Sequence, residues 1–448
     1  MNCNPDQYFL DYECVNYANY NKKISSILGE DAILDNGNTA WMLVASSMVM
    51  LMTPGVALFY GGLAGKKNSN NTILMSVICM AVITLTWILV GYSLSFGNWN
   101  EFLGSYQWFL LRNVGGAPSG AYGDKIPHIL FATFQNMFAQ ITPALISGSV
   151  VGRMKFGSFV AFIILWSVLI YSPLAHWVWS FTLDEAWLPT PLGWLGKLPS
   201  LDFAGGTVIH ISSGFSGLSA ALILGKRLHQ RDDPIDVNMV VLGTALLWWG
   251  WFGFNAGSAL SANAIAAYAF INTHIAACSG MITYLMLESI LKSYSTVVGA
   301  ASGILAGLVA ITPACGYVTP LASIVIGIAG SLISYLFIQF KKIHKLDDTL
   351  DSFAIHGMAG VVGALLTGVF ATQTINPTVP NGALYGNPML LLNQLITVVV
   401  SASYSFFGTL VILQLLKMTL GIRIEEEAEV RGIDISFHGA SVVEEDQI

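Results

Sequence analysis

The chain has 448 residues, of which 54% are apolar and only 10% are charged, whereas soluble domains usually contain about 25% charged residues. This composition excludes an ordinary soluble protein and favours one domain with many membrane spans. The formal charge of −7, from 19 basic and 26 acidic residues, gives no basic surface for nucleic acid and excludes it as a partner.

A helix that crosses a bilayer needs about 20 mostly apolar residues. Runs of this kind predict an all-α membrane protein with eleven transmembrane helices. In chain order they cover 39–63, 73–97, 127–151, 156–179, 203–225, 238–258, 262–291, 296–313, 318–340, 350–371 and 388–420. Several contain helix breakers, such as Pro54-Gly55 in the first run. Such breaks survive in lipid where neighbouring helices or a water-lined cavity satisfy the backbone, so we expect the helices to enclose a pathway.

Lysine and arginine are unevenly divided between the two sides of these spans. The loops on one side hold 14 of them and the loops on the other side hold five. Because cytoplasmic loops are enriched in basic residues, the first side is predicted to be cytoplasmic. An odd number of spans then places the N-terminus outside. The chain divides into an extracellular segment at 1–37, a transmembrane domain at 38–420 and a cytoplasmic tail at 421–448.

The two ends of the chain are polar. The N-terminal segment lacks the basic start and apolar core of a secretory signal, and we expect an ordered or partly ordered outer cap. On the oxidising side, its Cys3 and Cys14 either form a disulfide or remain free thiols. The tail is too short for an independent domain. It either docks on cytoplasmic loops or stays loose.

An acidic residue followed by an intramembrane histidine occurs twice. Asp202 precedes His210 in the fifth span, and Asp351 precedes His356 in the tenth. A rise of about 1.5 Å per residue places the histidines about 12 Å and 7–8 Å along their helices from the acids. Helices five spans apart cross the membrane in opposite directions. The repeated acid–histidine pattern therefore predicts an inverted repeat with both histidines near the bilayer centre.

An ionisable residue at that depth is costly and indicates function. A neutral imidazole has one donor and one acceptor, so two histidines can hydrogen-bond and line a path without adding charge. Packing against a facing helix is the alternative for this pair, and it is the favoured interpretation for His176 and His274. Two nitrogens make an incomplete zinc set, and no HExxH helix is present. Haem would need a second matched pair, so we expect no cofactor and no metal.

Aromatic residues gather at the outer end of the sixth span, in the segment 248–258, and Trp177 and Trp179 end the fourth span on the same side. An interfacial aromatic belt accounts for most of these rings. The alternative is a cation site, because a ring face attracts an ammonium-like ion with about 0.5–2 kcal/mol. The hydroxyl of Ser258 could accept one of the protons of such an ion.

Several segments resemble the ammonium transporter (Amt/Mep/Rh) family. They are DFAGGTVIHISSGFSGLSAALILGKR at 202–227, PGVALFYGGL at 54–63, WFGFNAGSA at 251–259, ITPACGYV at 311–318, DSFAIHG at 351–357 and GIDISFHG at 432–439. The GFNAGS run and the glycine-rich tail favour the Amt branch over the Rhesus branch. The resemblance covers nearly all of the chain beyond about residue 35. It implies a homotrimer in the cell membrane, with eleven helices, an inverted repeat of helices 1–5 and 6–10, and one pore per subunit.

The resemblance also implies roles for residues of the pore. His210 and His356 would be the paired pore histidines, and Trp251 would wall the pore beside them. Phe138 and Phe254 would be stacked rings that gate the outer entrance.

Outside that gate, the resemblance implies a substrate-binding site. Trp179 and Ser258, with Phe138, would recruit ammonium, and Asp202 would give structural support. An Asp at the start of a helix is ordinarily a cap for backbone N–H groups, and it need not touch the substrate.

The function implied is transport for nitrogen uptake, not enzymatic catalysis. Ammonium would be recruited outside and deprotonated, and ammonia would be conducted with or without a relayed proton; methylammonium would serve as an analogue. Potassium would need a cage of oxygen ligands, which rings and imidazoles do not offer. A cytoplasmic P-II-type regulator is compatible with the tail. The alternative function is an ammonium sensor or receptor that signals through the tail.

Overall fold

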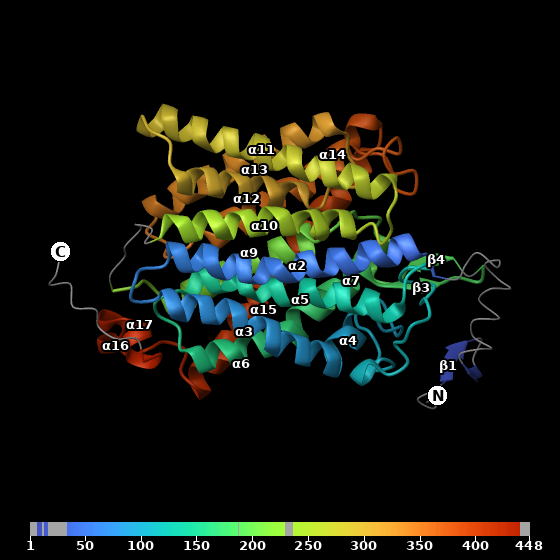
Figure 1. The fold of residues 1–448 in the computed structure, drawn as a ribbon, viewed down its shortest axis with the longest axis horizontal. Helices are drawn as coiled ribbons and strands as arrows, with labels where there is room; N and C mark the ends of the chain where they lie inside the picture. The colour runs from blue at the N-terminus through green and yellow to red at the C-terminus, as the bar shows by residue number, and fades with distance from the viewer. Residues whose placement is uncertain (1–6, 11–12, 17–33, 187, 229–235, 440–448) are drawn as a thin grey trace.

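The computed structural model describes residues 7–10, 13–16, 34–186, 188–228 and 236–439. Long helices lie side by side and run roughly along one direction (Figure 1). Among the described residues, ten helical segments are long and apolar enough to cross a membrane. The eighth expected span, 296–313, is the 15-residue apolar helix α12 (Val297–Ile311). The all-α membrane architecture is therefore confirmed, whereas the count of eleven crossings stays a prediction.

The first five expected spans form helices within a few residues of their predicted ends. They are α2 (Asn36–Leu63); α3 (Ser69–Thr86) continued by η2 (Trp87–Gly91) and α4 (Tyr92–Phe96); α5 (His128–Val150); α6 (Phe156–Trp166) continued by η4 (Ser167–Tyr171) and α7 (Ser172–Trp179); and η5 (Gly206–Ile211) continued by α9 (Ser212–Leu224).

The second half of the molecule repeats this pattern of long helices. It contains α10 (Val237–Gly257), α11 (Ala264–Lys292), α12, α13 (Pro320–Ile343), η6 (Phe353–Met358) continued by α14 (Ala359–Phe370), and α15 (Pro388–Thr419). An inverted relation between the two halves stays a prediction.

Several spans begin at a side-chain cap. The side chain just before the helix accepts a first-turn N–H group at Asp35, Asp236, Asn263, Thr296 and Thr319. Such a cap contributes about 0.5–2 kcal/mol. The polar residues between the apolar runs therefore set where these helices start.

Helices α2 and α10 approach each other closely through glycines. A Cβ atom added to Gly243 would lie 2.4 Å from the backbone N of Phe59, and one added to Gly253 would lie 2.8 Å from the carbonyl O of Ala45. Small residues allow close backbone packing in lipid, where helices gain no hydrophobic energy from association. This packing fixes the position of α10, which contributes Trp251 and Phe254 to the buried interior.

Short elements lie at the two ends of the helices. At the end shown on the right of Figure 1, β3 (Phe181–Leu183) pairs antiparallel with β4 (Pro189–Pro191). The other short helices between the spans are η3 (Phe109–Leu111), α8 (Trp194–Lys197) and η7 (Ala383–Tyr385).

The N-terminal segment contributes one strand pair, β1 (Gln7–Leu10) with β2 (Glu13–Asn16). Cys14 lies in β2, and Cys3 lies outside the described residues. The choice between a disulfide and free thiols therefore stays open.

The described part of the tail is docked at the end opposite to β3 and β4, where it forms α16 (Glu426–Arg431) and α17 (Ile433–Phe437) (Figure 1). The Asp434 carboxylate accepts the N–H groups of Asn70 and Asn71 at 2.8 Å each, at the start of α3. Arg423 pairs with Glu429 at 2.8 Å. Of the two alternatives from the sequence, docking on the loops holds for the tail up to residue 439.

Candidate functional site

His210 and His356 both lie in π-helical segments, η5 and η6. Segments of this kind are rare and are frequent at functional sites. The two elements come together where α9 crosses η6 at glycines. A Cβ atom added to Gly214 would lie 2.2 Å from the backbone N of Gly357. A side chain at Gly214 would not fit this crossing, which places the histidine-bearing turns against each other.

The structure brings His210 and His356 together. Their Nδ1 atoms are 3.2 Å apart, and their rings are nearly parallel, at 15° with centroids 5.3 Å apart. Both side chains are buried. One ring donates through Nδ1 and the other accepts, so one Nε2 is left as an acceptor and the other as a donor. Within the described part of the chain, the Nε2 of His210 has no hydrogen-bond partner.

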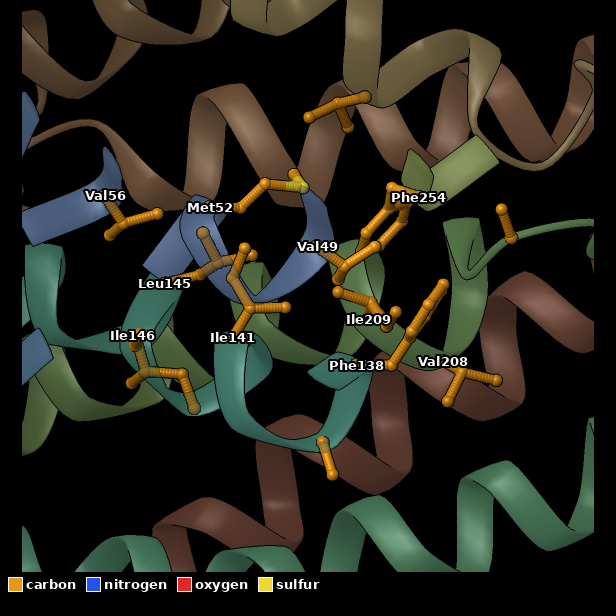
Figure 2. Packing of buried hydrophobic residues seen from close by; sticks show 14 of the residues in the cluster. Val49, Met52, Val56, Phe138, Ile141, Leu145, Ile146, Val208, Ile209 and Phe254 are labelled. Atoms are coloured by element: carbon orange, nitrogen blue, oxygen red, sulfur yellow. The ribbon is translucent and has the colours of Figure 1, made fainter. Parts of the chain in front are cut away.

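A narrow, mostly apolar cavity adjoins the pair. Its lining consists of Met52, Val56, Phe59, Tyr60, Ile141, Leu145, Ile209, His210, Leu247, Trp251, Phe254, Leu305, Ile355 and His356. Figure 2 shows several of these aliphatic side chains packed near the rings of Phe138 and Phe254. The hydroxyl of Tyr60 donates to the carbonyl O of Leu145 at 3.1 Å. Most of the lining therefore offers hydrocarbon, and the imidazole nitrogens are its main polar groups.

Trp251 lies against the ring of His210, with centroids 5.3 Å apart and planes at 16°. Its Nε1 donates to the hydroxyl of Thr312 at 2.9 Å, and that hydroxyl donates to the carbonyl O of Leu308 at 2.8 Å. Thr312 thus holds the indole over the histidine. Thr312 was not singled out from the sequence; a hydroxyl residue directly before the helix breaker Pro313 was the available signal.

Two phenyl rings lie beside the histidine pair. Phe138 of α5 and Phe254 of α10 are stacked at 4.2 Å and 18°, and Phe254 is 6.0 Å from the ring of His210. Both side chains are buried. The stack therefore lies directly beside the histidine pair, with Phe254 next to the ring of His210.

Trp179 and Ser258 lie next to this stack. The indole of Trp179 contacts Phe138 edge to face at 6.2 Å, and its Nε1 donates to the carbonyl O of Asp202 at 2.8 Å. Ser258 follows Phe254 by one helical turn and donates its hydroxyl to the carbonyl O of Phe254 at 2.9 Å. The lone pairs of Ser258 remain available as acceptors.

Asp202 has the contacts of a helix cap. Its carboxylate accepts the N–H groups of Gly205, Gly206, Thr207 and Val208 at 2.6–3.2 Å, and also the hydroxyl of Thr207. Burial raises the pKa of Asp202, and these hydrogen bonds act in the opposite direction. The residue positions the start of η5 and, through its carbonyl, Trp179.

Asp351, which precedes His356 as Asp202 precedes His210, does not cap its helix in the same way. Asp351 forms an ion pair with Lys341. Asp348 instead accepts the N–H of Phe353 at 2.8 Å, at the start of η6, and the hydroxyl of Ser149 at 2.6 Å. The acid that bonds the second histidine-bearing helix is therefore Asp348, which sequence spacing alone did not single out.

Two further histidines of the spans, His176 and His274, are not part of the cavity lining. His176 has both ring nitrogens against backbone carbonyls. His274 is on the exposed side of α11 with its ring beside Trp248, at 5.4 Å. Across the described ranges, no three His, Cys, Asp or Glu side chains gather closely enough to hold a metal ion.

Known proteins resemble this chain over most of its length. The family model for the Ammonium Transporter Family matches residues 40–443. The ammonium transporter of Aquifex aeolicus is 49% identical over 413 residues, which cover 91% of this chain and 94% of that protein. The crystal structure of Saccharomyces cerevisiae Mep2 matches with a TM-score of 0.81 and 36% identity over 88% of each chain. A structure described as a sensor Amt protein matches with a TM-score of 0.81 and 28% identity, covering 90% of this chain and 98% of the other.

Proposed function

The chain belongs to the ammonium transporter family, a family of membrane transporters, and from that premise we propose how it moves ammonium across the membrane. Ammonium binds outside at Trp179 and Ser258, passes the rings of Phe138 and Phe254 and releases a proton. Ammonia then travels along His210 and His356. The observation that supports this mechanism best is the hydrogen bond between two buried imidazoles beside an apolar cavity.

Recruitment in this proposal uses two kinds of contact. The indole of Trp179 attracts a cation through its ring face, which is worth about 0.5–2 kcal/mol. The hydroxyl oxygen of Ser258 accepts a hydrogen bond from an N–H of ammonium, because its own O–H donates to the carbonyl O of Phe254. Potassium has no proton to donate, so Ser258 favours ammonium over an ion of similar charge.

Deprotonation follows from the cost of the next step. A charge at the centre of a bilayer costs at least about 2.5–3.5 kcal/mol. The mostly hydrocarbon lining beyond Phe254 has few groups that could replace the hydrogen bonds of an ion's hydration shell. Neutral ammonia avoids this cost. The proton is therefore released before the molecule reaches the histidines.

The histidine pair matches ammonia chemically. Ammonia both donates and accepts hydrogen bonds, and the pair leaves one Nε2 as donor and the other as acceptor. The unpartnered Nε2 of His210 is such a group. Exchange of the shared proton between the two Nδ1 atoms would also let the pair relay a proton, as histidine chains do in transporters. Transport is electrogenic with that relay and neutral without it.

We propose the assembly and orientation that the family resemblance implies. The protein is a homotrimer with one pore per subunit, its N-terminus is outside, and its tail is cytoplasmic. The contacts of Asp434 and Arg423 join the tail to the loops and to the start of α3. A P-II-type regulator that binds this region could therefore change the cytoplasmic ends of the spans.

The decisive experiment replaces both His210 and His356 by Ala in proteoliposomes with a clamped membrane potential. We expect methylammonium uptake and ammonium-evoked current to fall by about tenfold or more, which corresponds to at least 1.4 kcal/mol. The matched control is His274→Ala, because that histidine lies on the exposed side of α11. Undiminished transport by the double variant would remove the histidines from the mechanism.

A sensor is the second candidate function, and the similarity to the sensor Amt protein favours it. A sensor would bind ammonium and move the docked tail without net transport. Uptake of labelled methylammonium by the purified, reconstituted protein separates the two functions. Accumulation of label supports transport, whereas binding without accumulation supports a sensor.

A further inference from the structure

His176 lies in the last turn of α7 and has no exposed surface. Its Nδ1 is 3.0 Å from the carbonyl O of Ser95, and its Nε2 is 2.7 Å from the carbonyl O of Asn100. A carbonyl oxygen can only accept a hydrogen bond, and a neutral imidazole has a single N–H. A neutral ring could therefore satisfy one of these contacts, and its other nitrogen would turn a lone pair toward an oxygen.

We infer that His176 carries a proton on both ring nitrogens, and that this imidazolium clamps together the outer ends of the second and fourth spans. Ser95 belongs to α4, which ends the second span, and His176 belongs to α7, which ends the fourth. The carbonyl end of a helix has partial negative charge and favours a cation. Two such ends meet at this ring.

The charge on His176 is stabilised by carbonyl dipoles and not by an ion pair. The elements α4, η4, α8 and η5 pack against α7, and the ionisable groups on them and on their adjoining loops are Tyr92, Glu101, Tyr106, Tyr171, Lys197, Asp202 and His210. Tyr404 of α15 also lies against α7, with its ring 4.6 Å from that of Trp177. Glu101 pairs with Lys197 at 3.2 Å at the surface. The Asp202 carboxylate accepts hydrogen bonds from the N–H groups of Gly205 and Thr207 at the start of η5. Among the described residues, the ring of His176 makes hydrogen bonds only with the carbonyl O atoms of Ser95 and Asn100.

The clamp adjoins the proposed recruitment site. The carbonyl O of His176 accepts the N–H and the hydroxyl of Ser180 at 3.2 and 2.6 Å, so the ring and backbone of His176 fix the helix end that presents Trp179. When the ring releases one proton, one of the two clamp bonds is lost and this end loosens. The expectation that ammonium recruitment weakens at alkaline pH rests on the proposed role of Trp179. The inference that His176 is doubly protonated does not depend on that role.

Solid-state NMR tests the protonation state directly. The protein, labelled with 13C and 15N and reconstituted in lipid bilayers, would be assigned sequentially through Ala175 and Trp177. We expect both ring nitrogens of His176 to show attached protons at neutral pH. An unprotonated ring nitrogen at neutral pH would overturn the inference. Because this measurement does not involve transport, its failure is distinguishable from failure of the proposed function.

Two substitutions test the clamp. His176→Gln supplies an amide with two N–H donors that does not titrate, whereas His176→Leu supplies none. We expect the thermal midpoint of the wild type to fall from neutral to alkaline pH relative to His176→Gln, and methylammonium affinity at neutral pH to drop roughly tenfold in His176→Leu but much less in His176→Gln.

His274→Gln is the control and should keep the pH dependence of the wild type. Equal pH dependence of the wild type and His176→Gln would contradict the clamp. If His176→Leu does not fold, the comparison of wild type with His176→Gln still decides the question.

Discussion

The hydroxyl of Ser258 donates a hydrogen bond to the carbonyl O of Phe254 at 2.9 Å, so its oxygen keeps its lone pairs as acceptors. Ser258→Ala removes that acceptor from the proposed recruitment site. A net hydrogen bond is worth about 1 kcal/mol, so we expect the apparent KM for methylammonium to rise roughly fivefold. The maximal rate should change little, because a contact made outside the phenyl stack belongs to binding and not to the later barrier. The measurement is the concentration dependence of uptake by proteoliposomes.

A matched residue separates this effect from a general disturbance of the outer surface. Ser261 lies close by in the chain and donates its hydroxyl to the carbonyl O of Ala259 at 3.2 Å. Ser261→Ala should leave the apparent KM unchanged. Equal shifts in the two variants would mean that the Ser258 hydroxyl has no specific part in recognition.

At the scale of elements, the extent of the spans could be predicted because the bilayer requires a fixed length of apolar residues. The run 156–179, for example, coincides with α6, η4 and α7 (Phe156–Trp179). The π-helical turns could not be predicted, because they depend on tertiary contacts. Gly205 precedes η5 with φ +113°, and a Cβ atom added to Gly206 would lie 2.5 Å from the Cβ of Pro313. Likewise, the spacing of Asp351 gave no sign that Asp348 bonds the start of η6.

The crossing of α9 with η6 provides the test at this scale. Gly214→Ala would place a Cβ atom 2.2 Å from the N and 2.4 Å from the Cα of Gly357. Overpacking of this kind lowers the free energy of unfolding by about 1–3 kcal/mol. Removing the clash requires η6, which carries His356, to move away from α9. We expect a lower thermal midpoint in detergent together with several-fold slower methylammonium uptake.

Gly157 in the first turn of α6 is the matched control, because a Cβ atom added there meets nothing within 4 Å. Gly157→Ala should be neutral, or stabilising by up to about 1 kcal/mol through helix propensity. If Gly214→Ala behaves like this control, the crossing does not determine the spacing of the histidines.

At the scale of the whole molecule, β3 and β4 lie at one end of the helices, and α16 and α17 lie at the other (Figure 1). The charge of the loops predicts that the end with α16 and α17 is cytoplasmic, because basic residues are retained on that side, and this orientation stays a prediction. The docking of the tail was left open, since it depends on a contact between Asp434 and the start of α3, 364 residues earlier. Contacts of such separation leave no local pattern in a sequence.

The orientation can be tested with two exposed glutamates at opposite ends of the molecule. Glu185 lies in the turn between β3 and β4, and Glu427 lies in α16. In a background without the native cysteines, Glu185→Cys should react with a membrane-impermeant maleimide in intact cells, and Glu427→Cys should react only after permeabilisation. The reverse pattern would place Trp179, which is two residues before β3, at the cytoplasmic face. The recruitment site would then collect ammonium from inside the cell, and the proposed direction of uptake would be wrong even if the histidine pathway were correct.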